Sequence, residues 1–376
     1  MNFAFSEEQD QLRDAVRKFM EAKSASADVR RLMETVEGYD ESVWKQMAQE
    51  LGLQSLHIPE AHGGQGFSFV ELGIVLEEMG RALLSAPYFA TVALAANAIM
   101  NAGSDAQQSQ LLPGIASGET IATLAFTEPN GKWDASGITM EATGSGDKVT
   151  LDGTKMFVID GHTANLIVVV ARQPGTGGED GISFFTVAGD ADGLTRTPLA
   201  TMDQTRKQAQ LEFSGVAAKP LGEPGAGWAA LSKTLDQAAV CLSNEMAGGA
   251  QQCLDMSVEY AKVRVQFGRP IGSFQAIKHK CADMLLEVES AKSAAYYASW
   301  SAAEDNEELP VVASLAKAYC SDAYFHAAAE TIQIHGGIGF TWEHDAHLYF
   351  KRAKSSEILL GDATYHRELL AQRIGI

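Results

Sequence analysis

The chain has 376 residues, and 48 Asp and Glu against 29 Lys and Arg give it a formal net charge of −19. At about 100–200 residues per domain, this length predicts two or three domains. A content of 46% hydrophobic and 20% charged residues is typical of a globular protein. The acidic excess argues against nucleic acid or an anionic membrane as the main partner, although one local basic pocket is enough for a small anionic ligand.

The cysteines and the N-terminal residues indicate a compartment. The four cysteines form no C-x-x-C pair, so we expect reduced thiols and no cysteine metal site. Residues 1–8 have neither the basic nor the apolar region of a signal peptide. The longest apolar stretch, 86–100, is too short to span a bilayer. These features predict a cytoplasmic protein.

Residues 1–121 predict an N-terminal all-α domain. Ser6 and Gln9 form a capping box that begins the first helix. A second periodic segment covers 42–53, and a third covers 70–79. Gly80 directly follows the third segment, so we expect it to cap that helix.

Residues 122–227 predict a middle β domain. Short runs rich in β-branched and aromatic residues recur here, at 121–126, 148–151, 156–159, 166–171, 182–187 and 210–213. Asp152-Gly153 lies between two of these runs and predicts a hairpin turn. Six short strands separated by turns indicate an antiparallel barrel or sandwich.

Residues 228–376 predict a C-terminal helical bundle of the four-helix type. Three long helical patterns cover 229–267, 274–303 and 311–334. The bundle contains no Glu-x-x-His motif, so the sequence predicts no di-iron centre and no other metal site. The predicted fold class is therefore α+β multidomain, in the order α, β, α.

Three segments are specific enough to indicate a family. They are Thr127-Glu128-Pro129, Arg264-Val265-Gln266-Phe267-Gly268, and Gln333-Ile334-His335-Gly336-Gly337-Ile338-Gly339. With these segments in an α-β-α order, the sequence resembles the acyl-CoA dehydrogenase family of flavoproteins over essentially its whole length. The resemblance implies an FAD cofactor and an acyl-CoA substrate.

The resemblance also implies which residues contact the flavin. Arg264 would bind the pyrophosphate through its guanidinium group, and Phe267 would pack against an adenosine or ring face. Gln333, Gly336 and Gly337 would let the backbone approach the dinucleotide closely. In the family these residues reach the flavin of a neighbouring subunit, so the chain is expected to form a dimer or tetramer with itself or with a homologous subunit.

A second group would lie beside the isoalloxazine ring. Thr127 corresponds to a hydroxyl residue that contacts the ring, while Phe157 and Ile159 occupy the strand behind it. Ile159 replaces a hydroxyl residue that is usual in the family.

Both positions where the family keeps its glutamate base hold aliphatic residues. The position near the C-terminus is Leu360, and the alternative position on the long helix after the β domain is Ala238. Two carboxylates could substitute for the missing base. Asp362 lies two residues past Leu360, and Glu245 lies seven residues past Ala238 on the same helix face.

Three functions remain open. The first is an FAD-dependent acyl-CoA dehydrogenase that desaturates a fatty acyl or steroid side-chain thioester and passes electrons to an electron-transferring flavoprotein. The second is a non-catalytic subunit that completes the FAD site of a homologous partner in a heteromeric dehydrogenase. The third is a flavin-dependent monooxygenase of the same fold, which needs no α-proton base.

Overall fold

The computed structural model describes residues 5–146 and 148–376. The chain divides into two compact units. Unit 1 contains Met1–Arg30, Ser68–Leu84 and Ala239–Ile376, and unit 2 contains Arg31–Phe67 and Ser85–Ala238.

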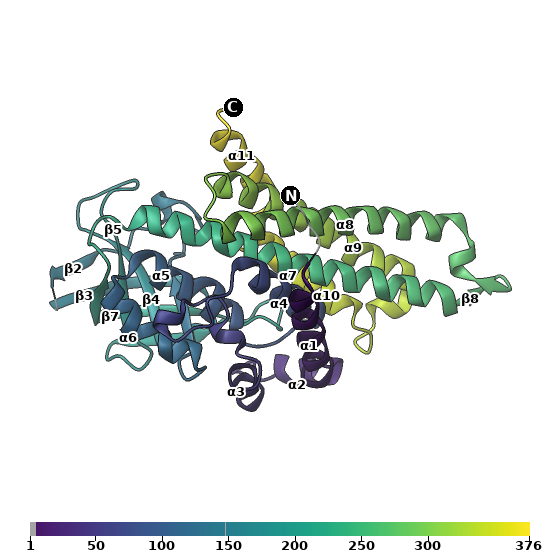
Figure 1. The fold of residues 1–376 in the computed structure, drawn as a ribbon, viewed down its shortest axis with the longest axis horizontal. Coiled ribbons are helices and arrows are strands. Elements are labelled where there is room, and N and C mark those ends of the chain that lie inside the picture. Colours follow the sequence, from purple (N-terminus) through teal and green to yellow (C-terminus); the bar gives the residue numbers. More distant parts are fainter. Residues whose placement is uncertain (1–4, 147) are drawn as a thin grey trace. The chain divides into compact units, whose positions relative to one another are not determined.

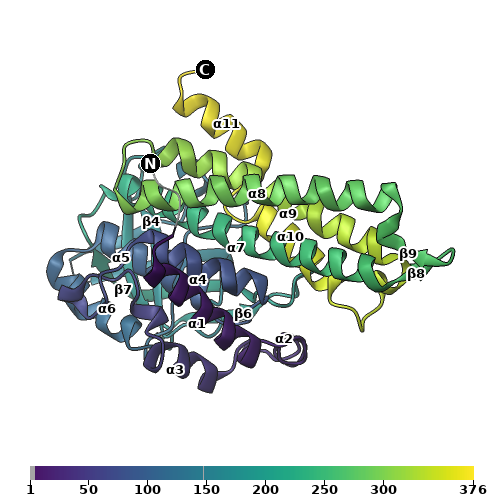
Figure 2. The same ribbon diagram turned by 45° about the vertical axis from the view of Figure 1, so that its right-hand side comes forward.

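Unit 1 is helical (Figures 1 and 2). Its helices are α1 (Glu7–Lys23), α4 (Phe69–Arg81), α8 (Gln275–Ala303), α9 (Leu309–His335), α10 (Ala346–Ile358) and α11 (Ala363–Arg373), together with most of α2 (Ser26–Met33) and of α7 (Gly227–Val263). Helices α8, α10 and α11 all contact α9. Alanines fill much of the core between α7, α8 and α9, and their small side chains allow close helix packing. The predicted bundle is confirmed.

The prediction that Gly80 caps a helix is wrong. Helix α4 continues through Gly80 and ends at Arg81, with Ala82 as its C-cap. A Cβ on Gly80 would lie 1.9 Å from the backbone oxygen of Glu245 on α7, and a Cβ on Gly248 would lie 1.8 Å from the backbone oxygen of Glu77 on α4. These two glycines let α4 and α7 pack backbone against backbone, which a capping pattern cannot reveal.

The helical pattern predicted through residue 267 ends earlier. Helix α7 stops at Val263, and a small hairpin of β8 (Val265–Gln266) and β9 (Arg269–Pro270) connects it to α8. Figure 1 shows this hairpin projecting beyond the ends of the long helices.

Unit 2 contains a seven-stranded sheet. Its strands are β1 (Ala122–Ala125), β2 (Ala142–Ser145), β3 (Lys148–Ile159), β4 (Leu166–Arg172), β5 (Ile182–Ala188), β6 (Leu194–Pro198) and β7 (Gln208–Leu221). The strand order is β1-β4-β5-β7-β3-β2, and β6 pairs with β7. All the pairs are antiparallel except β1–β4, which is parallel. The predicted sheet domain is confirmed, although its first strand breaks the antiparallel pattern.

The hairpin turn predicted at Asp152-Gly153 is wrong. Residues 148–159 form one continuous strand, and the register with β7 shifts between Leu151 and Gly153. Gly153 has φ +141°, so the glycine permits a bulge inside the strand. The remaining helices of unit 2 include α3 (Glu41–Gln49), α5 (Asn97–Ala102), α6 (Asp105–Ala116) and the π-helix η3 (Phe89–Ala96).

Among the described residues, no helix is both long enough and apolar enough to cross a bilayer.

Candidate functional site

The residues predicted to lie beside the flavin ring come together at one edge of unit 2. Thr127 follows β1, and its carbonyl accepts a hydrogen bond of 2.9 Å from the Met156 N–H of β3. The next residue, Phe157, has φ +58° and exposes 45% of its side chain. Ile159 points the other way and is only 3% exposed, while its carbonyl accepts from the Thr123 hydroxyl at 2.6 Å. The register shift between Lys155 and Val158 therefore turns Phe157 outward beside Thr127.

A buried ion pair lies directly behind this edge. The Lys155 ammonium donates to Glu128 Oε1 at 2.7 Å, and both side chains are buried. Glu128 also accepts from the backbone N–H groups of Thr139 and Met140. Burial lowers the pKa of Lys155 to about 8, although Glu128 opposes this shift. The pair fixes the strand end that carries Thr127, and neither residue was predicted from the sequence to have a role.

The predicted pyrophosphate and adenosine residues lie on the β8–β9 hairpin of unit 1. Arg264 directly follows α7, and its side chain is exposed. Phe267 lies at the tip with φ +53° and exposes 91% of its surface. Its only described ring contact is an edge-to-face contact with Phe274 at 6.0 Å between centroids. An aromatic side chain this exposed is typical of a binding or interface residue.

The Gln333–Gly337 segment lies close to the base of this hairpin. The Tyr260 ring at the end of α7 stacks on the His335 ring at the end of α9, with centroids 4.3 Å apart. Arg264 follows Tyr260 by one helical turn, and Gln333 and Gly337 flank His335. Two segments that are about 70 residues apart in the sequence therefore meet at one end of unit 1.

The backbone at this end is open. A Cβ built on Gly336 or on Gly337 would meet no atom within 4 Å, and Gly336 has φ +61°. Exposed loop glycines such as Gly177 have the same open surroundings, so the observation shows that the backbone here is accessible to an approaching molecule. The two glycines thus fit the predicted contact with a dinucleotide.

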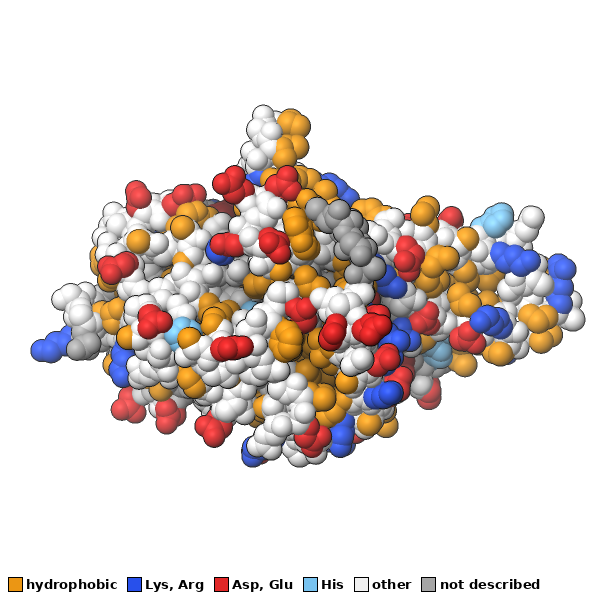
Figure 3. Space-filling view, viewed as in Figure 1, with side chains coloured by type: hydrophobic (Ala, Val, Ile, Leu, Met, Phe, Trp, Pro, Cys, Tyr) orange, Lys and Arg blue, Asp and Glu red, His pale blue; other side chains and the backbone are white. Residues whose placement is uncertain are grey.

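The same end is basic in an otherwise acidic protein. Five cations and no carboxylate occur between Tyr260 and Ala282, namely Lys262, Arg264, Arg269, Lys278 and Lys280. Two of them form ion pairs with carboxylates outside this stretch, Lys262 with Glu259 and Lys280 with Glu330. Figure 3 shows blue side chains gathered around the hairpin. An apolar cavity of about 410 Å³ lies beside it, lined by residues that include Val258, Ala261 and Ile277. The cations suit the phosphates of a ligand, and the apolar cavity suits a planar ring, so a molecule that has both fits this end of unit 1.

Both positions of the family's glutamate base are buried. Ala238 on α7 is fully buried, and Leu360 is 5% exposed. Leu360 lies in the turn between α10 and α11 and has φ +64°, an unfavourable conformation for a branched side chain. The turn therefore holds Leu360 at positive φ, although the leucine side chain cannot accept a proton.

The two candidate carboxylates have different surroundings. Glu245 is buried in unit 1, where its Oε1 accepts from the Arg352 guanidinium at 2.8 Å. Asp362 is exposed and is the N-cap of α11, with Oδ1 accepting from the Tyr365 N–H at 2.8 Å. Glu245 is committed to a cation, whereas Asp362 keeps an oxygen open to solvent.

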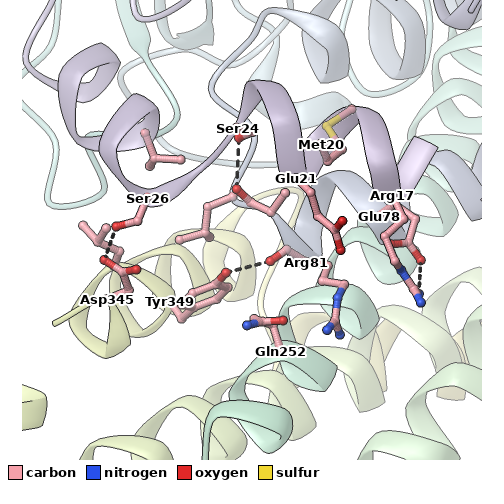
Figure 4. A pocket seen from close by; sticks show the side chains of 14 residues that line it. Arg17, Met20, Glu21, Ser24, Ser26, Glu78, Arg81, Gln252, Asp345 and Tyr349 are labelled. Atoms are coloured by element: carbon pink, nitrogen blue, oxygen red, sulfur yellow. Dashed lines mark hydrogen bonds and ion pairs between the residues drawn. The ribbon is translucent and has the colours of Figure 1, made fainter. Parts of the chain in front are cut away.

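A second cavity of unit 1, of about 310 Å³, has a polar lining contributed by α1, α4, α7 and α10 (Figure 4). Arg17 forms an ion pair with Glu78, and the Tyr349 hydroxyl donates to the Arg81 carbonyl. Asp345 accepts from the Ser26 hydroxyl at the opposite rim. Since charged side chains such as Arg17, Glu21 and Glu78 line this cavity, it does not suit an acyl chain, which needs an apolar lining.

Comparison with known proteins decides the family. The family models of the acyl-CoA dehydrogenase N-terminal, middle and C-terminal domains match residues 6–119, 123–216 and 225–375. The chain belongs to the acyl-CoA dehydrogenase family. It is 36% identical to acyl-CoA dehydrogenase IpdE2 of Mycobacterium tuberculosis, with 94% of this chain and 93% of that protein covered.

Solved structures of acyl-CoA dehydrogenases have the same fold. The butyryl-CoA dehydrogenase of Megasphaera elsdenii matches over 100% of both chains, with a TM-score of 0.93 and 29% identity. A variant of the Tcur3481-Tcur3483 steroid ACAD matches over 98% of both chains, with a TM-score of 0.88 and 31% identity. The fold class and the family resemblance predicted from the sequence are confirmed.

Several buried ionic groups of this acyl-CoA dehydrogenase homologue were not predicted from the sequence to have a role, among them Glu128, Lys155, Lys317 and Arg352. Lys317 gave a usable signal, because it is the one charged residue in the alanine-rich stretch 312–321. A lysine within an apolar helix face is costly to bury, so it points to a specific partner.

Proposed function

We propose that this chain is an FAD-dependent acyl-CoA dehydrogenase that desaturates a thioester between its α and β carbons. The observation that carries the proposal is the open, basic end of unit 1, where Gly336 and Gly337 leave room at the backbone and Phe267 is almost fully exposed. In a chain of net charge −19, a local excess of cations is what an anionic dinucleotide requires.

The proposed FAD contacts fall into two groups. Arg264, Phe267, Gln333, Gly336 and Gly337 would hold the dinucleotide part of a neighbouring subunit's flavin. Thr127 and Phe157 would contact the ring of the chain's own flavin, and the buried Ile159 would support the strand behind that ring. When bound, the flavin supplies the hydride acceptor of the reaction. The exposed Phe157 face and the Thr127 hydroxyl then define where the ring is held, and the Glu128–Lys155 pair keeps that strand edge rigid.

We propose that the active form is a dimer or tetramer, with a second copy or a homologous chain. Exposed apolar residues surround the dinucleotide-binding end of unit 1, namely Val263, Val265, Phe267, Ile338, Phe340 and Trp342. A patch of this kind in water favours association with a partner. An electron-transferring flavoprotein is the proposed acceptor for the electrons.

Asp362 is the proposed base for the α-proton. A base needs a carboxylate oxygen that can approach the substrate. Asp362 has one, since only Oδ1 is used in capping α11, and it lies two residues from the family's usual position. Glu245 is the second candidate, and its ion pair with Arg352 must open before it can accept a proton.

Flavin content and thioester turnover test the proposal. The chain is purified alone and together with a homologous chain, and bound FAD is counted per protomer. About one FAD per protomer and bleaching of the flavin by straight-chain or steroid side-chain acyl-CoA support the proposal. Two results together would instead indicate a non-catalytic subunit. FAD would be retained only with a homologue, and thioester turnover would be unchanged when Asp362→Asn and Glu245→Gln are introduced into this chain. Oxygen-dependent product formation would indicate a monooxygenase.

A further inference from the structure

Lys317 of α9 is a buried ammonium held entirely by neutral acceptors. Its side chain is fully buried, and Nζ donates to the Ser321 hydroxyl at 3.0 Å, the Glu357 carbonyl at 3.0 Å and the Gly361 carbonyl at 2.9 Å. Three donors therefore meet three acceptors. The Glu357 carboxylate forms its ion pair with Lys354 and interacts with the Lys317 ammonium only through its charge. A charge buried in this way is costly, so its retention calls for an explanation.

The acceptors identify what Lys317 holds. Glu357 lies in the last turn of α10, where carbonyls lack helical partners, and Gly361 belongs to the turn that leads to α11. Lys317 thus ties the end of one helix to the turn that follows it. The same turn carries Leu360 and Asp362.

His366 of α11 holds the turn from its other side. Its Nε2 lies 3.0 Å from the Leu360 carbonyl, and the ring is 4% exposed. Burial lowers the pKa of His366 to about 3, so the neutral ring donates Nε2–H to that carbonyl. Gly361, with φ +101°, leaves no room for a side chain, because a Cβ there would lie 2.3 Å from the Tyr365 ring. Two consecutive carbonyls of the turn therefore accept hydrogen bonds from buried side chains. The Leu360 carbonyl accepts from the His366 ring, and the Gly361 carbonyl accepts from Lys317.

We propose that Lys317 and His366 are positioning residues that hold the Leu360–Asp362 turn in the geometry needed for proton abstraction. This inference rests on the proposed function, which places the base on that turn. It explains why the chain keeps Leu360 at positive φ without a carboxylate there, since the clamp sets the backbone and thereby the direction of Asp362.

The clamp depends on pH. Burial lowers the pKa of Lys317 to about 7. The charged or titratable groups around it are Cys320 and Asp322 on α9, Glu357 on α10, and Asp362 and His366 on the turn and α11. As the pH rises through about 7, the ammonium becomes an amine with two N–H groups for three acceptors. The neutral amine then binds at most two of the three acceptors, and its hydrogen bonds to the carbonyls are weaker than those of the ammonium, so the turn loosens.

Hydrogen exchange and kinetics on the assembled flavoprotein test the inference. In Lys317→Met we expect the amides of 359–362 to exchange about tenfold faster, which corresponds to about one net hydrogen bond. We expect kcat to fall about 10- to 100-fold with little change in KM, because the substitution misplaces the base but leaves substrate binding unchanged. Ser321→Ala is the matched control, since it removes an acceptor of Lys317 that is not part of the turn, and its exchange and kcat should match the wild type.

A second pair of variants keeps the test decisive if Lys317→Met does not fold. His366→Ala should loosen the turn and lower kcat, while His366→Gln restores a donor to the Leu360 carbonyl and should recover both. Wild-type kcat should also fall above about pH 7, together with the protection of the turn amides from hydrogen exchange, corrected for intrinsic exchange.

Unchanged exchange and kcat in Lys317→Met, or in His366→Ala, would overturn the inference. Faster exchange with unchanged kcat would overturn the positioning role as well. A wild-type flavoprotein that turns over no thioester would instead refute the proposed function, and the exchange data would still decide whether the clamp exists.

Discussion

The Lys155 ammonium and the Glu128 carboxylate lie 2.7 Å apart in the interior of unit 2, with side-chain exposures of 0% and 4%. Burial opposes both charges, yet Glu128 keeps a pKa below its ordinary value because of Lys155 and the hydrogen bonds from Thr139 and Met140. Each group thus depends on the other to remain ionised. The strand edge that carries Thr127 is supported by this pair.

Replacing Lys155 with methionine should destabilise the protein strongly. The variant leaves Glu128 as a buried charge without its cation, which costs about 3–5 kcal/mol at neutral pH. Urea unfolding at pH 7 measures this loss. Lys45→Met is the matched control, because Lys45 forms an exposed pair with Glu41 and its loss should leave the stability nearly unchanged.

The loss in Lys155→Met should shrink as the pH falls. Without its cation, the buried Glu128 takes up a proton at a higher pH and becomes neutral, whereas in the wild type the lowered pKa of Glu128 preserves the ion pair to a lower pH. Equal stability of the variant and the wild type at pH 7 would contradict the prediction.

Alanine at Gly337 should weaken flavin binding without weakening the fold. Nothing lies within 4 Å of a Cβ at this position, so the free energy of unfolding should change by less than about 0.5 kcal/mol. A methyl group would nevertheless stand where the dinucleotide approaches the backbone, and FAD affinity should fall about tenfold. Flavin released on dilution gives the measurement.

Gly177→Ala is the control for Gly337→Ala, because Gly177 also lacks neighbours within 4 Å but lies in a loop of unit 2. It should leave both stability and FAD affinity unchanged. If Gly337→Ala binds FAD as tightly as the wild type does, the backbone of this segment does not contact the dinucleotide.

The Glu245–Arg352 pair should prove structural in a double-mutant cycle. Arg352→Met leaves a buried carboxylate and should cost about 3–5 kcal/mol. The further change Glu245→Gln should recover part of this loss, since it removes the uncompensated charge. Turnover per folded, flavin-loaded protomer should stay within about twofold in Glu245→Gln. A loss of about a hundredfold would make Glu245 the base in place of Asp362.

Acid should destabilise unit 2 through His57. This ring is buried, and its Nε2 donates to Asn97 Oδ1 at 2.9 Å. Burial lowers the pKa of His57 to about 4, against 6.5 in the unfolded chain. Between these values the unfolded state binds more protons, so stability rises with pH and is lost as the pH falls from about 6.5 to 4. The shift corresponds to about 3 kcal/mol.

Urea unfolding of the wild type and of His57→Gln between about pH 7 and pH 4 measures this contribution. Glutamine keeps a donor for Asn97 and does not titrate, so the variant should lose less stability over this range. Parallel pH profiles would show that His57 does not cause the acid loss.

Local patterns allowed the larger part of the fold to be predicted. The Ser6–Gln9 capping box and the long helices depend on neighbours in sequence, and the structure has them. Features that depend on a distant partner were missed. Gly153 forms a bulge because β7 continues past it, and the same dipeptide between isolated strands would be a turn.

The residues of the candidate site also fall into two groups, those that local sequence patterns reveal and those that depend on a distant partner. Motifs with unusual composition, such as Arg264–Phe267 and Gln333–Gly337, could be found from the sequence, and the Tyr260–His335 stacking shows that the two segments lie close together. Lys317 could not be connected to the Leu360 turn, since only the packing of α9 against α10 and α11 brings them within hydrogen-bond distance.

Alanine at Gly80 should destabilise unit 1 even though alanine is the better helix former. Propensity favours alanine over glycine by about 1 kcal/mol in a helix interior. The new Cβ would lie 1.9 Å from the Glu245 carbonyl oxygen, and backbone atoms of a packed helix cannot move aside. The steric cost exceeds the gain in helix propensity, so we expect the free energy of unfolding, measured in urea, to fall by about 2–3 kcal/mol. Gly114→Ala is the control, because its Cβ would meet chiefly the Thr120 side chain, which can rotate away, and it should change stability by less than about 1 kcal/mol. Equal effects of the two substitutions would show that α4 and α7 are not in backbone contact at Gly80.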